Sequence, residues 1–377
     1  MAYNRSEGGI KGGIISKFMR RPRTKWVCPS LGVAAVAVVV AIFSGSLTLF
    51  GDRLATLTQP NSAPVADQNV CSNSAKPPDH YDHVVWILEE NKALNQVIGH
   101  ADAPFISSLA KQCGYSTNYG DDEPRSAKGL GYHSLSHYLA GVSGSNCDLG
   151  NGQLGTHCVM NDAITPAKQS LSTETIFQQA QAAGLSWRSY QESSPSNCSL
   201  MSRRLYAARH DAALYFDSIR STCPIYDIAI PGLANANDAP SGALISAIRS
   251  GKLPSFSYVT PNLNNDMHNG SVKIGDAWLR AYLEPLFDSA DYKAGKVAVF
   301  IIWDEAQKAG QPLPNLVIAP SVHTGAVNAP MNGFTVLGTT QQLLGLPRLG
   351  CATGTPPGGM GTCGNGATTD LRAVFGL

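Results

Sequence analysis

HVVWILEE occupies residues 83 to 90, and this stretch decides how the rest of the sequence is interpreted. Its apolar residues run from Val84 to Leu88 without interruption, and two carboxylates and an asparagine follow. A short apolar run rich in β-branched residues is typical of a strand buried on both faces of a parallel sheet. The acidic residues then lie at the carboxyl end of the strand, which is where α/β sheets bind ligands.

Similar runs recur along the chain, at residues 185–191, 254–261, 296–305 and 314–320. Helical patterns separate or flank them, at 104–112, 173–183, 241–250, 275–288 and 335–345. Alternating strands and helices predict an α/β fold of three layers, with a mostly parallel central sheet between two layers of helices.

The first 50 residues differ from the rest. The stretch from Leu31 to Phe50 carries no charge and is long enough, at about 20 residues, to span a bilayer as a helix. We predict a basic cytoplasmic leader (1–26), a transmembrane or signal segment (27–50), a linker (51–78) and one folded domain (79–377). Both alternatives, an uncleaved anchor and a cleaved signal peptide, place the domain outside the cytoplasm.

The charge distribution limits the possible partners. Residues 1–25 contain seven Lys or Arg and one acid, a net charge of +6, so the total of +1 leaves −5 for the remainder. A mildly acidic domain argues against nucleic acid, because binding a phosphate backbone needs a basic face. We expect a monomer that meets the membrane through its N-terminal helix.

Eight cysteines follow the apolar stretch, an even number that fits disulfide bonds in an oxidising compartment. The absence of a C-x-x-C pair argues against a zinc–thiolate site. Many connectivities are compatible with the sequence, so the pairing stays open. Loop closure favours Cys147–Cys158, Cys198–Cys223 and Cys351–Cys363, with Cys71–Cys113 from the remaining two.

Five polar clusters are candidates for chemistry: Glu89-Glu90-Asn91, His133 to His137, Asn262 to His268, Asp304-Glu305 and His323. A carboxylate at a strand end is more often a helix cap or a solvated group, so the hypothesis depends on all five meeting at one sheet edge. Oxygen ligands with one or two imidazoles suit a divalent ion, which neutralises phosphoryl charge. A serine beside such an ion becomes a nucleophile.

These clusters resemble the bacterial phosphoesterase family of secreted acid phosphatases and phospholipases C, within the alkaline-phosphatase superfamily. The resemblance extends from about residue 82 to the C-terminus, and the secreted mycobacterial acid phosphatase type is the most similar. It implies an alkaline-phosphatase-like fold. The motifs that carry it are VVWILEENK (84–92), APFISSLA (103–110), TPNLNNDMHNGSVKIGDAWL (260–279), VFIIWDE (299–305), LPNLVIAPSVHTG (313–325) and LLGLP (343–347).

The resemblance also implies roles for individual residues. Ser134 falls at the nucleophile position, and His268 is a candidate general acid or metal ligand. His133 and His137 are candidates for binding the substrate, and His137 also for catalysis. The implied ligands of one or two divalent metal ions are Glu90, Asn91, Asp266, His268, Asp304 and Glu305.

Two departures from the family pattern bear on this assignment. The family segment His-Pro-Ser-x-Pro-Asn-Tyr reads Tyr132-His133-Ser134-Leu135-Ser136-His137-Tyr138 here, so a histidine replaces the asparagine. Gly333 stands where the family has a histidine before its last long helix. Glycine has no side chain to bind metal, and His323 could substitute only if its loop approaches the site.

We therefore predict a metal-dependent phosphomonoester hydrolase that acts outside the cytoplasm on a phosphorylated small molecule or a phospholipid headgroup. One alternative keeps the fold and makes the protein a phospholipase C or another phosphodiesterase. A second alternative is a surface-binding descendant without activity, which the altered serine segment and Gly333 would explain.

Overall fold

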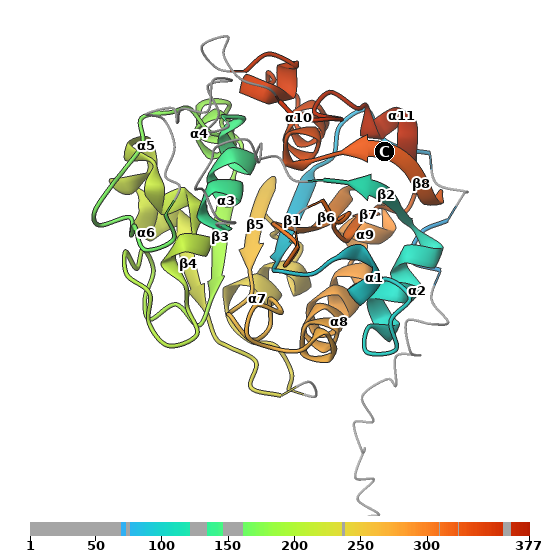
Figure 1. Ribbon diagram of the computed structural model, residues 1–377, viewed down its shortest axis with the longest axis horizontal. Helices are drawn as coiled ribbons and strands as arrows, with labels where there is room; N and C mark the ends of the chain where they lie inside the picture. The colour runs from blue at the N-terminus through green and yellow to red at the C-terminus, as the bar shows by residue number, and fades with distance from the viewer. Residues whose placement is uncertain are drawn as a thin grey trace, which may run out of the picture. The chain divides into compact units, whose positions relative to one another are not determined.

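The five predicted strands lie side by side in one sheet. The computed structural model describes residues 69–72, 76–120, 134–145, 161–235, 238–308, 310–322, 324–356 and 363–377. In this part of the chain eight strands follow the order β4-β3-β5-β1-β6-β7-β2-β8 (Figure 1). Their bounds are β1 (His83–Glu89), β2 (Gly114–Tyr119), β3 (Trp187–Glu192), β4 (Asp227–Ile230), β5 (Phe256–Thr260), β6 (Val297–Trp303), β7 (Asn315–Ile318) and β8 (Gly325–Met331).

Most strand pairs are parallel, as predicted. β1 pairs in parallel with β5 on one side and β6 on the other, and β3 pairs in parallel with β5 and β4. All seven residues of β6 are buried, as expected of a central strand covered on both faces. Only β7 runs against its neighbours, antiparallel to both β6 and β2.

Helices cover both faces of the sheet. The longer ones are α2 (Pro104–Gln112), α3 (Ser134–Ser143), α4 (Ile176–Ala182), α7 (Ala243–Arg249), α8 (Val272–Asp288) and α10 (Gly333–Leu343). Short helices are α1 (Leu94–Val97), α5 (Asp217–Arg220), α6 (Cys223–Tyr226), α9 (Ala290–Lys293), α11 (Leu371–Phe375) and the 3₁₀ turns η2 (Ala208–His210), η3 (Ala212–Tyr215) and η4 (Gly350–Thr353).

The side chains of β1 show how the two layers are divided. Val85 and Ile87 face residues of α7 and α8, whereas Trp86 and Leu88 face α3. The indole Nε1 of Trp86 also donates to Thr340 Oγ1 of α10, 2.8 Å away. Because successive strand residues point to opposite faces, α3 and α10 lie on one side of the sheet and α7 and α8 on the other (Figure 1).

The antiparallel direction of β7 corrects one expectation. We expected all five polar clusters at one edge of the sheet, including His323 after the last predicted strand. β7 ends at the opposite edge from β6, so the segment after Ile318 begins away from Asp304. His323 itself lies outside the described residues. An apolar run such as PNLVIAP predicts a strand but contains no information about its direction.

Three strands were not predicted from the sequence: β2, β4 and β8. Their sequences are GYSTNY, DIAI and GAVNAPM, which are polar, short or interrupted by proline. β4 and β8 are the two edge strands, and β2 lies next to β8. Strands near a sheet edge are less buried, so their sequences lack the apolar run by which the central strands are recognised.

The N-terminal boundary of the folded domain lies earlier than residue 79. Val70 N donates to Gln112 Oε1 at 3.1 Å, and Tyr292 Oη donates to Val70 O at 2.9 Å. A disulfide joins Cys71 to Cys113 at the end of α2. Residues 69–72 are therefore part of the folded domain, although they fall within the predicted linker (51–78).

Disulfide bonds also join Cys198 to Cys223 and Cys351 to Cys363, and both are pairs that loop closure favours. The pair Cys147–Cys158 and the apolar segment 27–50 lie outside the described residues. Within the described ranges, no helix has both the length and the apolar character needed to cross a membrane. The disulfides fit a protein that folds in an oxidising compartment outside the cytoplasm.

Two motif residues of TPNLNNDMHNGSVKIGDAWL have structural roles. Asp276 of α8 accepts hydrogen bonds from the first amides of α2, Phe105 N at 3.3 Å and Ile106 N at 2.8 Å, and so fixes that helix against α8. A Cβ atom at Gly270 would overlap the carbonyl group of Asn264. The loop from Asn262 to Gly270 therefore closes tightly on itself only with glycine at its end.

The Gly270→Ala substitution should destabilise the domain by about 1–3 kcal/mol, because the added methyl group forces the backbone of this loop apart. Urea unfolding followed by tryptophan fluorescence measures the change. Gly120→Ala is the matched control, since an added Cβ there meets nothing within 4 Å. Equal stability of the two variants would contradict the assigned role of Gly270.

Candidate active site

The candidate site lies at the carboxyl ends of β1, β5 and β6, which are neighbours in the sheet. Glu90 and Asn91 follow β1, Asp266 lies in the loop after β5, and Asp304 follows β6. Backbone hydrogen bonds join these strand ends: Glu90 N donates to Asp266 O at 2.8 Å, and Asp304 N to Glu89 O at 3.2 Å. The predicted convergence of the acidic strand ends is therefore present in the structure.

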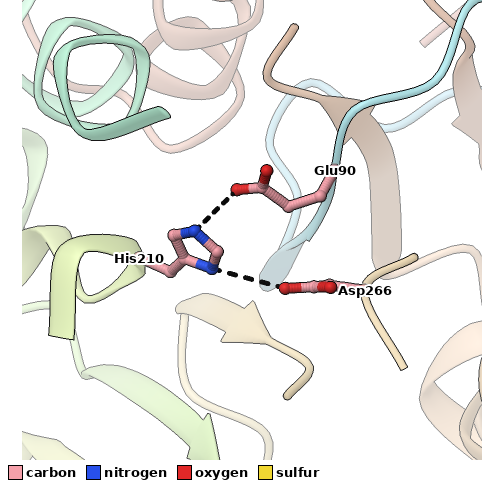
Figure 2. Close-up of side chains that lie close together, drawn as sticks. All are labelled: Glu90, His210 and Asp266. Atoms are coloured by element: carbon pink, nitrogen blue, oxygen red, sulfur yellow. Dashed lines mark ion pairs between the residues drawn. The ribbon is translucent and has the colours of Figure 1, made fainter. Parts of the chain in front are cut away.

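A histidine links two of these carboxylates. His210, which ends η2, is 1% exposed and lies between Glu90 and Asp266 (Figure 2). Its Nε2 is 2.9 Å from Glu90 Oε1, and its Nδ1 is 3.3 Å from Asp266 Oδ2. The ring stacks on Tyr138 of α3, with centroids 4.9 Å apart. This stacking and the contacts of its two nitrogens fix the orientation of the ring.

Ser134 is the first residue of α3 and is 2% exposed. Its hydroxyl donates to Glu90 Oε2 at 3.1 Å, and the amide Nδ2 of Asn91 donates to the same oxygen at 2.9 Å. Asp304 accepts from the backbone N–H of Asn91 at 3.2 Å through Oδ1 and also interacts with Glu90 and Ser134. The nucleophile predicted from the sequence thus lies within this cluster.

The electrostatics of the cluster call for a cation. Burial raises the pKa of Glu90 and of Asp266 to about 7, and burial together with the nearby charge of Glu90 raises that of Asp304 well above its usual range. Burial lowers the pKa of His210, so its neutral ring has one N–H to share between two carboxylates. Carboxylates this crowded keep their charge only with a positive partner.

The donor set fits a divalent metal ion. One ligand atom from each of Glu90, His210 and Asp266 can be chosen so that all lie within 4.8 Å of one another. Glu90 Oε1 and Asp266 Oδ2 are buried against the two ring nitrogens of His210, which carries only one N–H when neutral, and Asp304 Oδ2 is also buried. Two or three carboxylates with one imidazole form a typical site for a hard or borderline ion.

The other predicted residues that the structure describes lie around this cluster. Glu305 is buried, and its Oε2 is 3.7 Å from Nε2 of His137 on α3. His133 lies outside the described residues. Gly333, the first residue of α10, lines a small cavity of about 30 Å³ together with His137 and Asp304. Where the family pattern has a histidine, this chain therefore has a glycine beside a small cavity that Asp304 also lines.

The asparagines of the NLNNDMH motif support the site without entering it. Glu192, at the end of β3, accepts from Asn262 N at 2.8 Å and from Asn265 Nδ2 at 2.9 Å. These bonds fix the loop at Asn265, the residue immediately before Asp266. Lys92 donates to Met267 O at 2.6 Å and fixes the loop from the other side.

His268 differs from its predicted position as a metal ligand. Its backbone N–H donates to Asp266 Oδ1 at 2.7 Å, but its ring contacts Arg209 and Asn269. Nε2 of His268 is 3.0 Å from Arg209 Nη2. The group of possible metal ligands contains His210 in its place.

Arg209 and His210 were not identified from the sequence. They lie in an irregular segment between β3 and β4, which the disulfide Cys198–Cys223 encloses, and no strand or helix pattern marks the segment. One signal was available. Residues 209–211 read Arg-His-Asp within the otherwise apolar stretch AARHDAALYF (207–216), and a charged triplet in such a stretch needs buried partners.

Comparison with known proteins agrees with the geometry. The sequence profile of the Phosphoesterase family matches residues 129–347, more than half of the chain, and the chain belongs to this family. A phosphatidylinositol-3-phosphatase from Mycobacterium tuberculosis is 28% identical over 280 residues, which cover 74% of this chain and 81% of that protein.

Two further proteins are more distant. A probable acid phosphatase from Kluyveromyces lactis is 25% identical over 213 residues, covering 54% of this chain and 44% of that protein. Among solved structures, a protein of the alkaline phosphatase superfamily from Vibrio parahaemolyticus has a TM-score of 0.47 and 13% identity. The match covers 77% of this chain and 72% of that one.

The buried carboxyls predict an unusual dependence of stability on pH. Without metal, Glu90 and Asp266 keep their protons up to pH about 7 in the folded state, whereas the unfolded chain releases them near 4.5 and 3.8. The folded state binds more protons in this window, so the unfolding free energy should fall by a few kcal/mol, roughly, as pH rises from 4 to 7.

Thermal unfolding of residues 69–377 in chelator, measured at pH 5 and pH 7.5, tests this. The midpoint should be lower at pH 7.5, and saturating Zn²⁺ or Mn²⁺ should remove most of the difference, because the bound ion stabilises the ionised carboxylates. A midpoint that rises between these pH values in chelator would show that the carboxyls are not protonated in the metal-free site.

Proposed function

We propose that this protein is a metal-dependent phosphomonoester hydrolase with Ser134 as its nucleophile. The hydrogen bond from Ser134 Oγ to Glu90 Oε2, inside the cluster of carboxylates and His210, carries this proposal. The names of the relatives, a phosphatidylinositol-3-phosphatase and acid phosphatases, support the same reaction class. Membership of the Phosphoesterase family supports it independently of the site geometry.

The reaction begins at the serine hydroxyl. Glu90 Oε2 accepts the hydrogen bond of Ser134, so it is placed to take the proton as the oxygen attacks phosphorus. The bond from Ser134 Oγ to phosphorus forms while the bond to the leaving oxygen breaks, which gives a phosphoseryl intermediate. Water then attacks this intermediate, releases phosphate and restores the hydroxyl.

Glu90, His210 and Asp266 would hold a divalent ion, with Asp304 and Asn91 beside it. When bound, such an ion supplies positive charge that lowers the pKa of the serine hydroxyl and offsets the charge of the phosphoryl group. Glu305 remains a candidate ligand for a second position, whereas Arg209 and Asn269 occupy both ring nitrogens of His268. Gly333 provides no ligand there, so we favour a single ion.

His137 is placed to act on the leaving group. It lines the cavity next to Asp304, and Glu305 lies 3.7 Å from its Nε2. A protonated imidazole at this position can donate a proton to the departing oxygen. His268 is less suited to this role, because its ring accepts a hydrogen bond from Arg209.

The similar proteins indicate the class of substrate, and the disulfides indicate the cellular compartment. A phosphatidylinositol-3-phosphatase as relative favours a phosphorylated lipid headgroup, and the disulfides favour a compartment outside the cytoplasm. We propose that the domain acts there, held by the apolar segment 27–50 or released from it.

Replacing Ser134 by Ala should lower kcat on p-nitrophenyl phosphate by about 1,000-fold or more, because the nucleophile is lost. Ser143→Ala, at the end of the same helix, removes a hydroxyl that donates to Leu139 O and accepts from Ser145 N, and it should keep full turnover. Circular dichroism checks that both variants fold. Turnover retained by a folded Ser134→Ala variant would exclude the serine mechanism.

Replacing His210 by Asn should weaken metal binding by at least about 10-fold, because the imidazole that joins Glu90 to Asp266 is lost. Calorimetric titration of the chelator-treated protein with Zn²⁺, Mn²⁺ or Mg²⁺, each alone, measures the affinity without reference to activity. The exposed His100→Asn variant serves as the control. Unchanged affinity in His210→Asn would remove His210 from the ligand set.

A further inference from the structure

Arg209 lies between the start of helix α3, which carries Ser134, and the loop that carries Asp266 and His268. It precedes His210 in η2 and is only partly exposed. On one side its Nε lies 3.7 Å from Asp162 Oδ2, and Asp162 Oδ1 accepts from Leu135 N at 3.0 Å. Leu135 follows Ser134, so a single carboxylate separates the guanidinium from the peptide group of the nucleophile.

On its other side Arg209 contacts the Asp-x-His motif. Its Nη2 is 3.0 Å from Nε2 of His268. A guanidinium has no acceptor, so His268 must accept through Nε2 and carry its proton on Nδ1, which lies 2.8 Å from Asn269 Oδ1. Burial, together with nearby positive charge that includes Arg209, lowers the pKa of His268, which agrees with a neutral ring. His268 therefore holds the guanidinium in place.

Among the described residues, few partners use the donors of the Arg209 guanidinium. Within the described residues its one hydrogen bond is the contact with His268, and its Nε is buried without one. An arginine side chain has five N–H donors in a planar arrangement. When it is held in place and some of these donors have no protein acceptor, it is well suited to bind phosphate oxygens. The positive charge of Arg209 also favours the ionised form of Glu90, so it acts at the cluster.

Lys92, another cation beside the cluster, has a different environment. Its ammonium group donates to Met267 O at 2.6 Å, and the surrounding charges are the carboxylates of Asp266, Glu90 and Glu89. Lys92 thus offsets the negative charge of the buried acids that surround it. Arg209 lies on the side of the nucleophile, where an incoming phosphoryl group would be.

We propose that Arg209, held by Asp162 and His268, binds the non-bridging phosphoryl oxygens and makes the site select phosphomonoesters over phosphodiesters. This inference rests on the proposed function and specifies its substrate class. A monoester near neutral pH is a dianion with three non-bridging oxygens, and a diester is a monoanion with two. A fixed positive charge with a planar pair of donors therefore stabilises the monoester more.

The test compares Arg209→Ala and Arg209→Lys with the unchanged protein on p-nitrophenyl phosphate and bis(p-nitrophenyl) phosphate. Loss of hydrogen bonds to a charged group should lower kcat/KM for the monoester by about 10- to 100-fold in Arg209→Ala, with a much smaller loss for the diester. Arg209→Lys, which keeps the charge but not the paired donors, should fall between. Added guanidinium ion should partly restore monoester turnover to Arg209→Ala.

Arg203→Ala is the matched control, because Arg203 is exposed in the same disulfide-enclosed segment. It should leave the ratio of the two kcat/KM values unchanged. Equal losses on both substrates in Arg209→Ala, or no loss on the monoester, would overturn the assignment of Arg209.

Binding of inorganic phosphate, measured by calorimetry, separates this inference from the proposed function. If the unchanged protein hydrolyses no monoester, the proposed function fails. Phosphate affinity still decides the role of Arg209: weaker binding in Arg209→Ala than in Arg203→Ala supports an anion site, and equal binding refutes it.

Discussion

Repulsion among buried carboxylates is the constraint on which the arrangement of this site depends. Glu89 and Glu90 are fully buried at the end of β1, and Asp266 and Asp304 approach them from the neighbouring strands. Burial raises the pKa of Glu89 well above its usual range, and the charges of Asp266 and Glu192 raise it further. This environment favours the protonated form of Glu89, and the other carboxylates of the cluster need a cation to be charged.

The surrounding structure is organised to keep these groups close together. Asn262 and Asn265 satisfy the carboxylate of Glu192, so this acid adds no unpaired oxygen to the cluster. The left-handed backbone of Met267, with φ of 73°, turns its carbonyl toward Lys92. Positive φ at a bulky residue costs about 1–3 kcal/mol, and such strain is concentrated at functional sites.

The central sheet and the acidic half of the site could be predicted from the sequence. The runs that became β1, β5 and β6 are predominantly apolar, and a parallel sheet brings their ends together, so Glu90, Asp266 and Asp304 were expected to converge. Strand direction is not encoded in such runs, which is why the reversal at β7 was missed. His210 and Arg209 were missed because an irregular, disulfide-enclosed segment places them, and no periodic pattern indicates where such a segment lies in space.

The two halves of the site therefore have different structural origins. The carboxylates belong to the ends of central strands, where any shift in register would disturb the whole core. His210 and Arg209 belong to a connection outside the sheet, and connections tolerate changes in length and sequence far better than strands do. During divergence from a common ancestor, the acidic half would stay fixed while the connection between β3 and β4 varied. Related proteins could thus acquire different substrate preferences without altering the sheet that positions their nucleophile.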